Sequence, residues 1–393
     1  MKQGILTINA GSSSIKFALF PLARPISPEA EVSGQIDGIG TNATKMVAKD
    51  KAGQKIADQA IAGEQVSHDL AFDALLKWFS ATQADWQIVA VGHRVVHGGD
   101  LYSQPTVIDA QVLEHLTGFI PLAPLHEPHN VAGIRALQTL LPAVPQVACF
   151  DTAFHRSQPE VAQSFALPRS LTAEGIKRYG FHGLSYEFIA RALPQHSHRA
   201  NGRVIVAHLG NGASMAAMVG RKCVATTLGF STIDGLMMGT RCGNLDPGVI
   251  LHLMETKGYT VKDMTRILYK ESGLLGVSGL SQDMRTLLAS DKPEAREAVE
   301  LFCYRIVREL GSLVAAAGGL DALVFTGGIG EHAAEVRRRV CEQAAWLGIQ
   351  LNQEANARHD LVISAGKSSV DVLVIPTNEE WMMAHHAQTL LAL

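Results

Sequence analysis

The opening segment ILTINAGSSSIKFALF (residues 5–20) places six small residues, NAGSSS (9–14), between two apolar runs. Both runs are rich in strand-forming residues, and the second alternates roughly in polarity. The segment therefore predicts a β-hairpin with a hydroxyl-rich turn. A Walker A loop needs Gly-x-x-x-x-Gly-Lys-Ser/Thr running from a strand into a helix, and this segment has neither feature.

A second segment, VIVAHLGNGASMAAMV (204–219), repeats this plan in the other half of the chain. It has an apolar strand, a turn of Gly and Asn, and a strand of small residues. A hairpin that recurs with a glycine-containing turn is best explained by internal duplication.

Helical patterns extend each half into a domain. Residues 65–79 and 299–317 carry apolar side chains along one helical stripe, so both predict helices that pack on a core. We therefore predict an α/β fold of two domains, residues 1–150 and 151–380, with a last helix, 381–393, that packs back on the first domain.

Three turns follow strands and contain glycine: NAGSSS (9–14), LGNGAS (209–214) and TGGIGEH (326–332). Glycine lets backbone amides approach a ligand closely, and amides in a concave turn favour phosphate oxygens. Lys16 could add a positive charge. One such turn alone would be an ordinary tight turn, but three at corresponding points predict a cleft that grips ATP between the domains. A dinucleotide-binding GxGxxG motif is excluded, because neither hairpin turn opens a helix.

The composition is that of a globular protein: 393 residues, 47% hydrophobic and 18% charged. A formal charge of −3 argues against nucleic acid as a partner, so local Arg and Lys must bind small anions. Five scattered Cys fit a reducing compartment. The apolar run before Asn9 is too short for a signal peptide, and no run reaches ~18 residues, so we expect a cytoplasmic protein.

Two arginines lie among glycine turns, Arg94 in GHRVVHGG (92–99) and Arg241 in GLMMGTRCGNLDPG (235–248). With few carboxylates beside them, both are predicted oxyanion ligands, because guanidinium is planar, bidentate and permanently charged. His93 and His97 do not suggest zinc, since four residues of strand would separate them by ~13 Å.

HEPH (126–129) is also a poor metal motif, because Pro128 is expected to exclude a regular helix there.

Asp151 and His182 are candidates for chemistry. Asp151 ends an apolar strand in CFDTAFH (149–155), where ligands gather in α/β proteins, and His182 follows an aromatic residue in RYGFHGLS (178–185). The plain alternatives are a helix N-cap for Asp151 and a partly buried structural residue for His182. The serines of the first turn lack the G-x-S-x-G elbow of a hydrolase.

These motifs together resemble the acetate and propionate kinases, members of the sugar-kinase, heat-shock-chaperone and actin superfamily. They run in family order from residue 9 to 380: NAGSSSIKF, GHRVVHGG, FDTAFH, RYGFHG, HLGNGAS, GLMMGTRCGNLDPG, DMR, FTGGIGEH and PTNEE. The resemblance implies a duplicated actin-like ATPase fold. It also implies a homodimer and reversible phosphoryl transfer from ATP to acetate, giving ADP and acetyl phosphate, with Mg²⁺ or alternatively Mn²⁺.

The resemblance also implies roles for individual residues. The metal would be bound or oriented by Asn9 and Glu379. The transferring phosphoryl group would meet Asp151, His182 and Arg241. The acyl substrate would be bound by Arg94, Val96, Leu125, Phe181 and Thr232. ATP would contact Ser12, Ser14, Lys16, His208, Leu209, Gly210, Asn211, Gly212, Asp283, Met284, Arg285, Gly328, Ile329, Gly330, Glu331 and His332. Acetate is already ionised at neutral pH, so Asp151 is expected to orient groups or the metal rather than to remove a proton.

Four positions depart from the family pattern: Glu127 and His129 in HEPH, His332, and Thr232, where Pro is frequent beside the acyl group. The last bears on the choice between acetate and propionate.

Two other functions remain open at this point. A carbohydrate kinase of the same superfamily would need a base and a hydrogen-bonding sugar pocket, and an actin-like ATP switch would show no acetate dependence.

Overall fold

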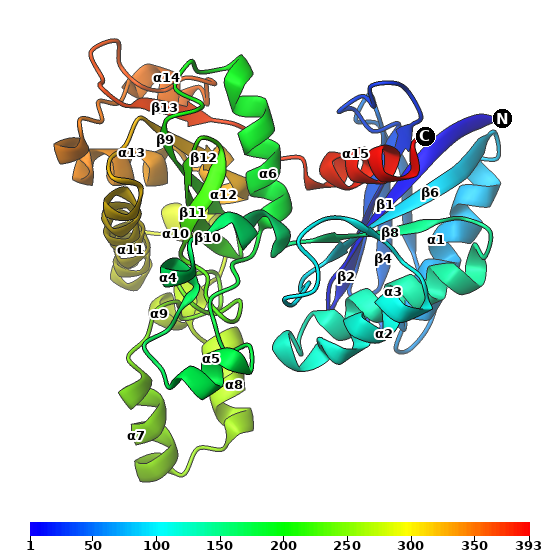
Figure 1. Ribbon diagram of the computed structural model, residues 1–393, viewed down its shortest axis with the longest axis horizontal. Coiled ribbons are helices and arrows are strands. Elements are labelled where there is room, and N and C mark those ends of the chain that lie inside the picture. Colours follow the sequence, from blue (N-terminus) through cyan, green and yellow to red (C-terminus); the bar gives the residue numbers. More distant parts are fainter. The chain divides into compact units, whose positions relative to one another are not determined.

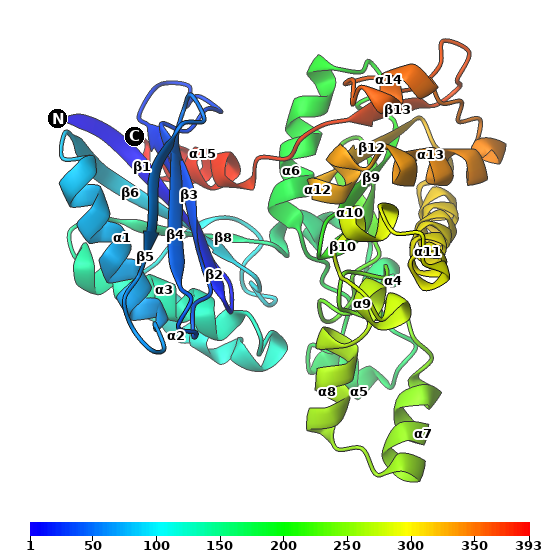
Figure 2. The same cartoon turned by 180° about the vertical axis from the view of Figure 1, so that it is seen from behind.

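The computed structural model describes all 393 residues and divides them into two compact units (Figure 1). Unit 1 consists of Met1–Ala153 and Asn378–Leu393, and unit 2 of Phe154–Thr377. Each unit has its own mixed β-sheet with helices on it (Figure 2).

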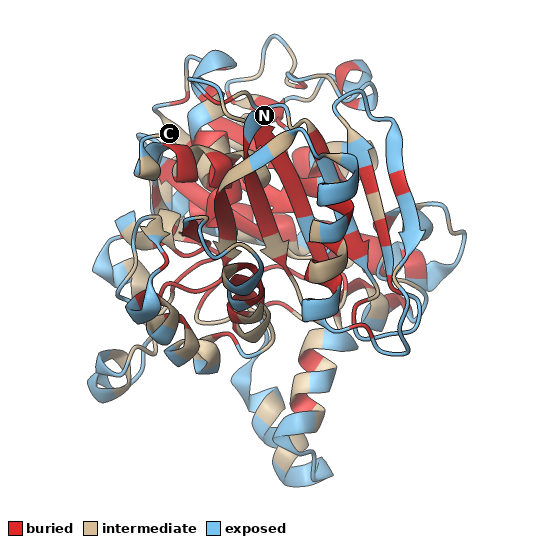
Figure 3. Cartoon of the chain, turned by 90° about the vertical axis from the view of Figure 1, so that its right-hand side faces the viewer, coloured by how far each residue is buried: buried red, intermediate tan, exposed pale blue.

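Unit 1 has an eight-stranded sheet in the order β5-β4-β3-β2-β1-β6-β8-β7. The strands are β1 (Lys2–Ala10), β2 (Ser14–Pro21), β3 (Val32–Asp37), β4 (Lys45–Asp50), β5 (Lys55–Ala60), β6 (Trp86–Val95), β7 (Thr106–Val107) and β8 (Gln146–Phe150). The central strands are buried, whereas the edge strand β5 is largely exposed (Figure 3).

The helices of unit 1 cover both faces of this sheet. They are α1 (His68–Thr82), α2 (Ala110–Gly118), α3 (Glu127–Leu140) and α15 (Glu379–Leu391), with a 3₁₀ turn η1 (Ile120–Leu122). Val91 of β6 packs in the core with Leu75 of α1 and Leu137 of α3. The next residue, Gly92, faces the backbone of Met383 in α15. Successive strand residues point to opposite faces, so α15 lies on the face opposite α1 and α3.

Unit 2 has a five-stranded sheet in the order β11-β10-β9-β12-β13. The strands are β9 (Arg203–Leu209), β10 (Ala213–Val219), β11 (Lys222–Thr226), β12 (Ala322–Thr326) and β13 (Asp371–Val374). The helices are α4 (Glu160–Gln163), α5 (Arg169–Ala173), α6 (Gly183–Ala192), α7 (Pro247–Lys257), α8 (Val261–Lys270), α9 (Gly273–Ser278), α10 (Met284–Leu288), α11 (Pro293–Ala317), α12 (Gly327–His332), α13 (Ala334–Gln343) and α14 (Gln353–Ala357). Three 3₁₀ turns complete it: η2 (Ala153–Ser157, which starts at the end of unit 1), η3 (Leu193–Gln195) and η4 (Ala345–Leu347).

The two sheets repeat one arrangement of five strands. In unit 1, β3-β2-β1 are antiparallel neighbours, and β1, β6 and β8 are parallel neighbours. In unit 2, β11-β10-β9 are antiparallel, and β9, β12 and β13 are parallel. The predicted duplication and both predicted hairpins are therefore confirmed, with β4, β5 and β7 as additions to unit 1.

The predicted core stripe of the long helix is also confirmed. Helix α11 packs on the sheet of unit 2. The five residues of the stripe are all buried: Val299, Phe302, Ile306, Leu310 and Leu313. None of the helices combines the length and the apolar character that crossing a membrane requires.

The expectation that Pro128 excludes a helix is wrong. Helix α3 begins at Glu127, with Pro128 in its first turn. The first amides of a helix have no partner inside the helix, so a proline there removes no hydrogen bond. His129 therefore lies in a helix.

Candidate active site

Arg94 is the centre of a polar cluster in unit 1. It is the next-to-last residue of β6, and β8, the parallel neighbour of β6, ends one residue before Asp151. The guanidinium Nε donates to both carboxylate oxygens of Asp151, at 3.0 and 3.1 Å, and Nη2 donates at 2.5 Å. The Asp151 side chain is only 1% exposed. Its carboxylate therefore orients Arg94 and does not serve as a helix N-cap.

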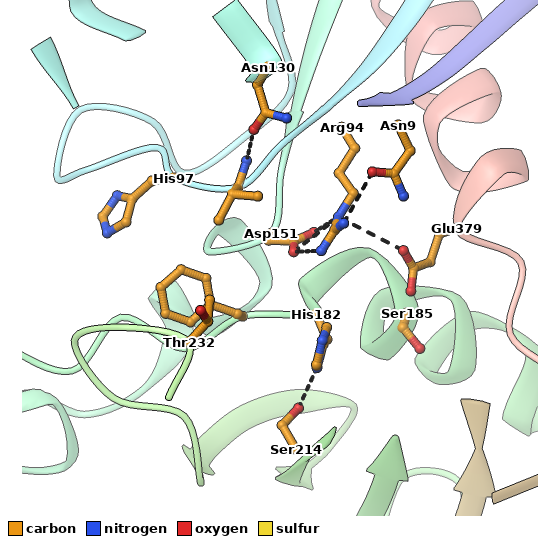
Figure 4. A network of polar contacts seen from close by, with 12 residues as sticks. Asn9, Arg94, His97, Asn130, Asp151, His182, Ser185, Ser214, Thr232 and Glu379 are labelled. Carbon is orange, nitrogen blue, oxygen red and sulfur yellow. Dashed lines mark hydrogen bonds and ion pairs between the residues drawn. The ribbon is translucent and has the colours of Figure 1, made fainter. Parts of the chain in front are cut away.

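Asn9 and Glu379 complete this cluster. Asn9 lies near the end of β1, and its Oδ1 accepts a hydrogen bond of 3.2 Å from Arg94 Nη1. Glu379 is the first residue of α15, and its Oε2 lies 4.0 Å from Arg94 Nε (Figure 4). The structure thus brings together four predicted site residues from four separate segments of unit 1.

Burial and charge determine protonation in the cluster. Burial alone would lower the pKa of the Arg94 guanidinium, but the neighbouring Asp151 carboxylate more than offsets this and raises it. Burial also raises the pKa of Glu379 to about 7, although Arg94 opposes the shift. Arg94 therefore keeps its charge, and a cation beside Glu379 would favour the ionised form of that carboxylate.

The chain beyond Arg94 is held by side chains that sequence reasoning missed. Val96 N donates to Asn130 Oδ1 at 3.0 Å, and Asn130 Nδ2 donates to the backbone oxygen of Ala10 at 2.8 Å. Gly98 N donates to Thr152 Oγ1 at 3.1 Å. A polar residue buried in a helix is the signal for such a role, but only the fold shows that Asn130 is buried.

Glu127 is the most unusual of these side chains. It is fully buried at the start of α3, and its Oε2 accepts from His97 N at 3.2 Å. Its Oε1 has no hydrogen-bond partner. Burial raises the pKa of this carboxyl to about 8, so the protein holds it as a neutral acid at neutral pH.

In unit 2, His182 precedes helix α6 with φ of 59°, a left-handed conformation that is uncommon for a residue other than glycine. Its Nδ1 lies 2.8 Å from Ser214 Oγ (Figure 4). Its ring stacks on that of His208, with centroids 4.4 Å apart. The His182 ring is therefore held by stacking on one of its faces and by a polar contact at Nδ1.

The other nitrogen of His182 and the Arg241 guanidinium both lie close to Gly212, in the turn between β9 and β10. A Cβ atom placed on Gly212 would lie 3.5 Å from His182 Nε2 and 3.8 Å from Arg241 Nη1. Arg241 is held by a 3.0 Å hydrogen bond from Nη1 to the backbone oxygen of Thr232. Two side-chain nitrogens thus lie beside the same glycine turn, an arrangement that suits an oxyanion when both carry protons.

A pocket of about 390 Å³ lies next to this turn in unit 2. Eight predicted ATP residues line it: Gly210, Asn211, Asp283, Met284, Arg285, Gly328, Ile329 and His332. Three further lining residues were missed, although two of them adjoin predicted residues: Gln282, Leu288 and Ala333.

The remaining predicted ATP residues do not line this pocket. Leu209 and Gly330 are buried, and Glu331 accepts hydrogen bonds from Gly327 N and Thr377 N. His208 stacks on His182 instead. Gly212 belongs to the donor site described above. The others, Ser12, Ser14 and Lys16, lie in unit 1 around the turn that joins β1 to β2.

The four predicted acyl-contact residues divide evenly between the units. Val96 and Leu125 lie in unit 1, and Phe181 and Thr232 in unit 2. Val96 and Phe181 are almost fully buried, whereas Leu125 and Thr232 are partly exposed. Their joint role in binding an acyl chain stays a prediction.

Comparison with known proteins places this chain in a family. The model of the acetokinase family matches residues 4–385. The chain belongs to the acetokinase family. A curated acetate kinase of Rhodopseudomonas palustris is 55% identical over 98% of both chains. Among solved structures, a propionate kinase of Francisella tularensis matches with a TM-score of 0.91 at 38% identity, over 98% of this chain and 99% of that one.

The acetate kinase of Porphyromonas gingivalis matches with a TM-score of 0.88 at 35% identity, over 99% of this chain and all of that one. These matches confirm an α/β fold shared with acetate and propionate kinases.

Proposed function

We propose that this member of the acetokinase family is an acetate kinase, which transfers a phosphoryl group reversibly between ATP and acetate to give ADP and acetyl phosphate. The observation that carries the proposal is the convergence of His182 Nε2 and Arg241 Nη1 over the Gly212 turn, beside the pocket of about 390 Å³. Phosphoryl transfer depends on positioned donors and charge neutralisation rather than on covalent chemistry by the protein. The 55% identity to a curated acetate kinase over 98% of both chains supports the assignment.

The side-chain oxygens of Asn9 and Glu379 suit Mg²⁺. No group of three or more His, Cys, Asp or Glu side chains is placed to bind a metal by itself. Mg²⁺ commonly uses one or two protein oxygen ligands, with substrate phosphates and water for the rest. The Asn9 amide oxygen and the Glu379 carboxylate, both beside Arg94, supply such ligands. When bound, the ion would neutralise phosphate charge.

The roles of the protein groups follow from their contacts. Arg94 binds the acetate carboxylate, because Asp151 and Asn9 leave it one N–H on each terminal nitrogen for a further acceptor. Asp151 orients that guanidinium and need not act as a base, since acetate is already ionised. His182 and Arg241 stabilise the oxygens of the transferring group. The turn at 210–212 contributes backbone amides to the phosphates.

The decisive experiment traps acyl phosphate with hydroxylamine. Purified protein with ATP and Mg²⁺ should form acetohydroxamate only when acetate is present. ATP hydrolysis that is independent of acetate would favour an ATP-driven switch instead. Phosphorylation of sugars without hydroxamate formation would favour a carbohydrate kinase.

We also propose, on the family resemblance, that the protein is a cytoplasmic homodimer. Light scattering on the purified protein should give twice the mass of one chain. A monomeric mass at micromolar concentration would contradict it.

A further inference from the structure

The His182 imidazole, the Ser214 hydroxyl and the Tyr186 hydroxyl form a row of three neighbouring groups that begins at His182 Nδ1. Ser214 Oγ lies 2.8 Å from His182 Nδ1 and 2.5 Å from Tyr186 Oη. Tyr186 and Ser214 are both fully buried. All three residues lie in unit 2: Ser214 on β10, and His182 and Tyr186 at the beginning of α6, where Tyr186 N donates to His182 O.

The first turn of α6 also contacts His208, whose ring stacks on that of His182. Ser185 Oγ lies 2.8 Å from His208 Nδ1, and the two imidazole rings stack with an angle of 23° between their planes. The ring of His182 therefore has one face against His208 and its Nδ1 against Ser214. What remains to be determined is which of its nitrogens carries the proton.

The serine hydroxyl links the two ends of the row, since it has one proton to donate and can also accept. If Tyr186 donates to Ser214, then Ser214 donates to His182 Nδ1. A neutral imidazole whose Nδ1 accepts a hydrogen bond carries its own proton on Nε2. That is the nitrogen that converges with Arg241 over Gly212.

We propose that Ser214 and Tyr186 are positioning residues, whose hydroxyls hold His182 in the tautomer that presents Nε2–H to the transferring phosphoryl group. The proposal rests on the proposed phosphotransferase function. In the opposite tautomer, Nε2 would direct a lone pair at phosphate oxygens and lose its stabilising contact. The left-handed backbone of His182 agrees with this role, because such strain persists where the surrounding structure holds a functional side chain.

The test uses Tyr186→Phe and Ser214→Ala in the full-length protein. Tyr179→Phe is a matched control, because Tyr179 is also buried in unit 2 but donates to the backbone oxygen of Gly175 at 2.9 Å. Circular dichroism and thermal unfolding check that each variant folds. Tyr186→Phe keeps the ring and removes only the hydroxyl, so it remains informative if Ser214→Ala does not fold.

The first measurement is the ¹⁵N spectrum of the histidine side chains, with the His182 signals assigned by their loss in His182→Gln. The wild type should show the Nε2–H tautomer, and both variants should shift toward Nδ1–H or a mixture. The control should match the wild type. A wild type in the Nδ1–H form, or variants with an unchanged tautomer, would overturn the proposal.

The second measurement separates kcat from KM. In metal sites, loss of a group that orients a ligating histidine typically costs ~10- to 100-fold in activity. We expect kcat to fall by roughly that factor, with the KM values for ATP and acetate little changed. Raised KM at unchanged kcat would overturn the positioning role. If the wild type makes no acyl phosphate, the proposed function fails, while the spectrum still reports the tautomer.

Discussion

Arg241 supplies a permanent positive charge at the point where His182 Nε2 faces the Gly212 turn. Arginines that stabilise a transferring phosphoryl group contribute ~10³-fold or more to kcat. We predict that Arg241→Ala lowers kcat by that order and changes the KM for acetate much less. Arg266→Ala, which removes an exposed arginine paired with Glu271, is the control. Nearly normal kcat in Arg241→Ala would remove this residue from the mechanism.

The buried carboxyl of Glu127 predicts a pH dependence of stability. Its pKa is about 8 in the folded protein, against 4.5 for an ordinary glutamate. Between these values the unfolded chain releases the proton and the folded chain keeps it. The contribution of Glu127 to the free energy of unfolding is therefore largest below pH 4.5, and it is lost as the pH rises to about 8.

We predict that Glu127→Gln gains stability relative to the wild type between pH 5 and pH 8, by roughly 4 kcal/mol at most. Urea unfolding of both proteins at the two pH values measures it. Glu160→Gln, at an exposed position, should show no such difference. Parallel pH profiles for wild type and Glu127→Gln would show that Glu127 is ionised in the folded protein.

Substrate size is the third prediction at this scale. If Val96, Leu125, Phe181 and Thr232 surround the acyl chain, three apolar side chains and one small polar one enclose it. One methylene discriminates by only ~1–3 kcal/mol, or roughly 10–200-fold. We expect acetate to be preferred, propionate to carry a several-fold to tenfold penalty, and butyrate to be poor. The ratio of kcat/KM for the three acids tests this.

A preference for propionate would change the assigned substrate and leave the chemistry intact. The structural similarity to a propionate kinase makes this comparison necessary. A preference for butyrate would contradict the assignment of Phe181 and Leu125 to the acyl site.

At the scale of elements, the contact between β6 and α15 places Glu379 beside Arg94. Gly92 permits this contact, because a Cβ there would lie 3.0 Å from Met383 O. We predict that Gly92→Ala destabilises the protein by about 1–3 kcal/mol, the usual cost of overpacking. Activity should also fall, since Arg94 follows two residues later on the same strand.

Gly118→Ala is the matched control, because Gly118 ends α2 and no atom lies within 4 Å of an added Cβ. This control should keep or slightly raise the melting temperature. Equal melting temperatures for Gly92→Ala and the wild type would show that α15 can shift without cost.

At the scale of the whole molecule, the proposed chemistry divides between the units. Unit 1 carries Arg94 and Asp151, and unit 2 carries His182 and Arg241. Transfer requires both sets of groups to engage the substrates and exclude water. We predict that an ATP analogue together with acetate reduces the radius of gyration in small-angle scattering. An unchanged radius with both ligands bound would contradict closure.

The sequence by itself determined the two hairpins, their duplication, the core stripe of α11 and the family. These depend on patterns that repeat over a few residues, or on motifs that are contiguous. The same local reasoning failed at Pro128, because an expected break proved to be the first turn of a helix. Local patterns identify elements better than they locate the ends of those elements.

Only the tertiary structure decided how the site is assembled. Arg94 bonds Asp151 across 57 positions of sequence and Asn9 across 85, and Ser214 meets Tyr186 across 28. The burial of Glu127 likewise appears only when α3 packs on the sheet. Hydrogen-bond partners and burial depend on side chains that chain folding brings together, and the spacing of residues along the sequence does not record that proximity.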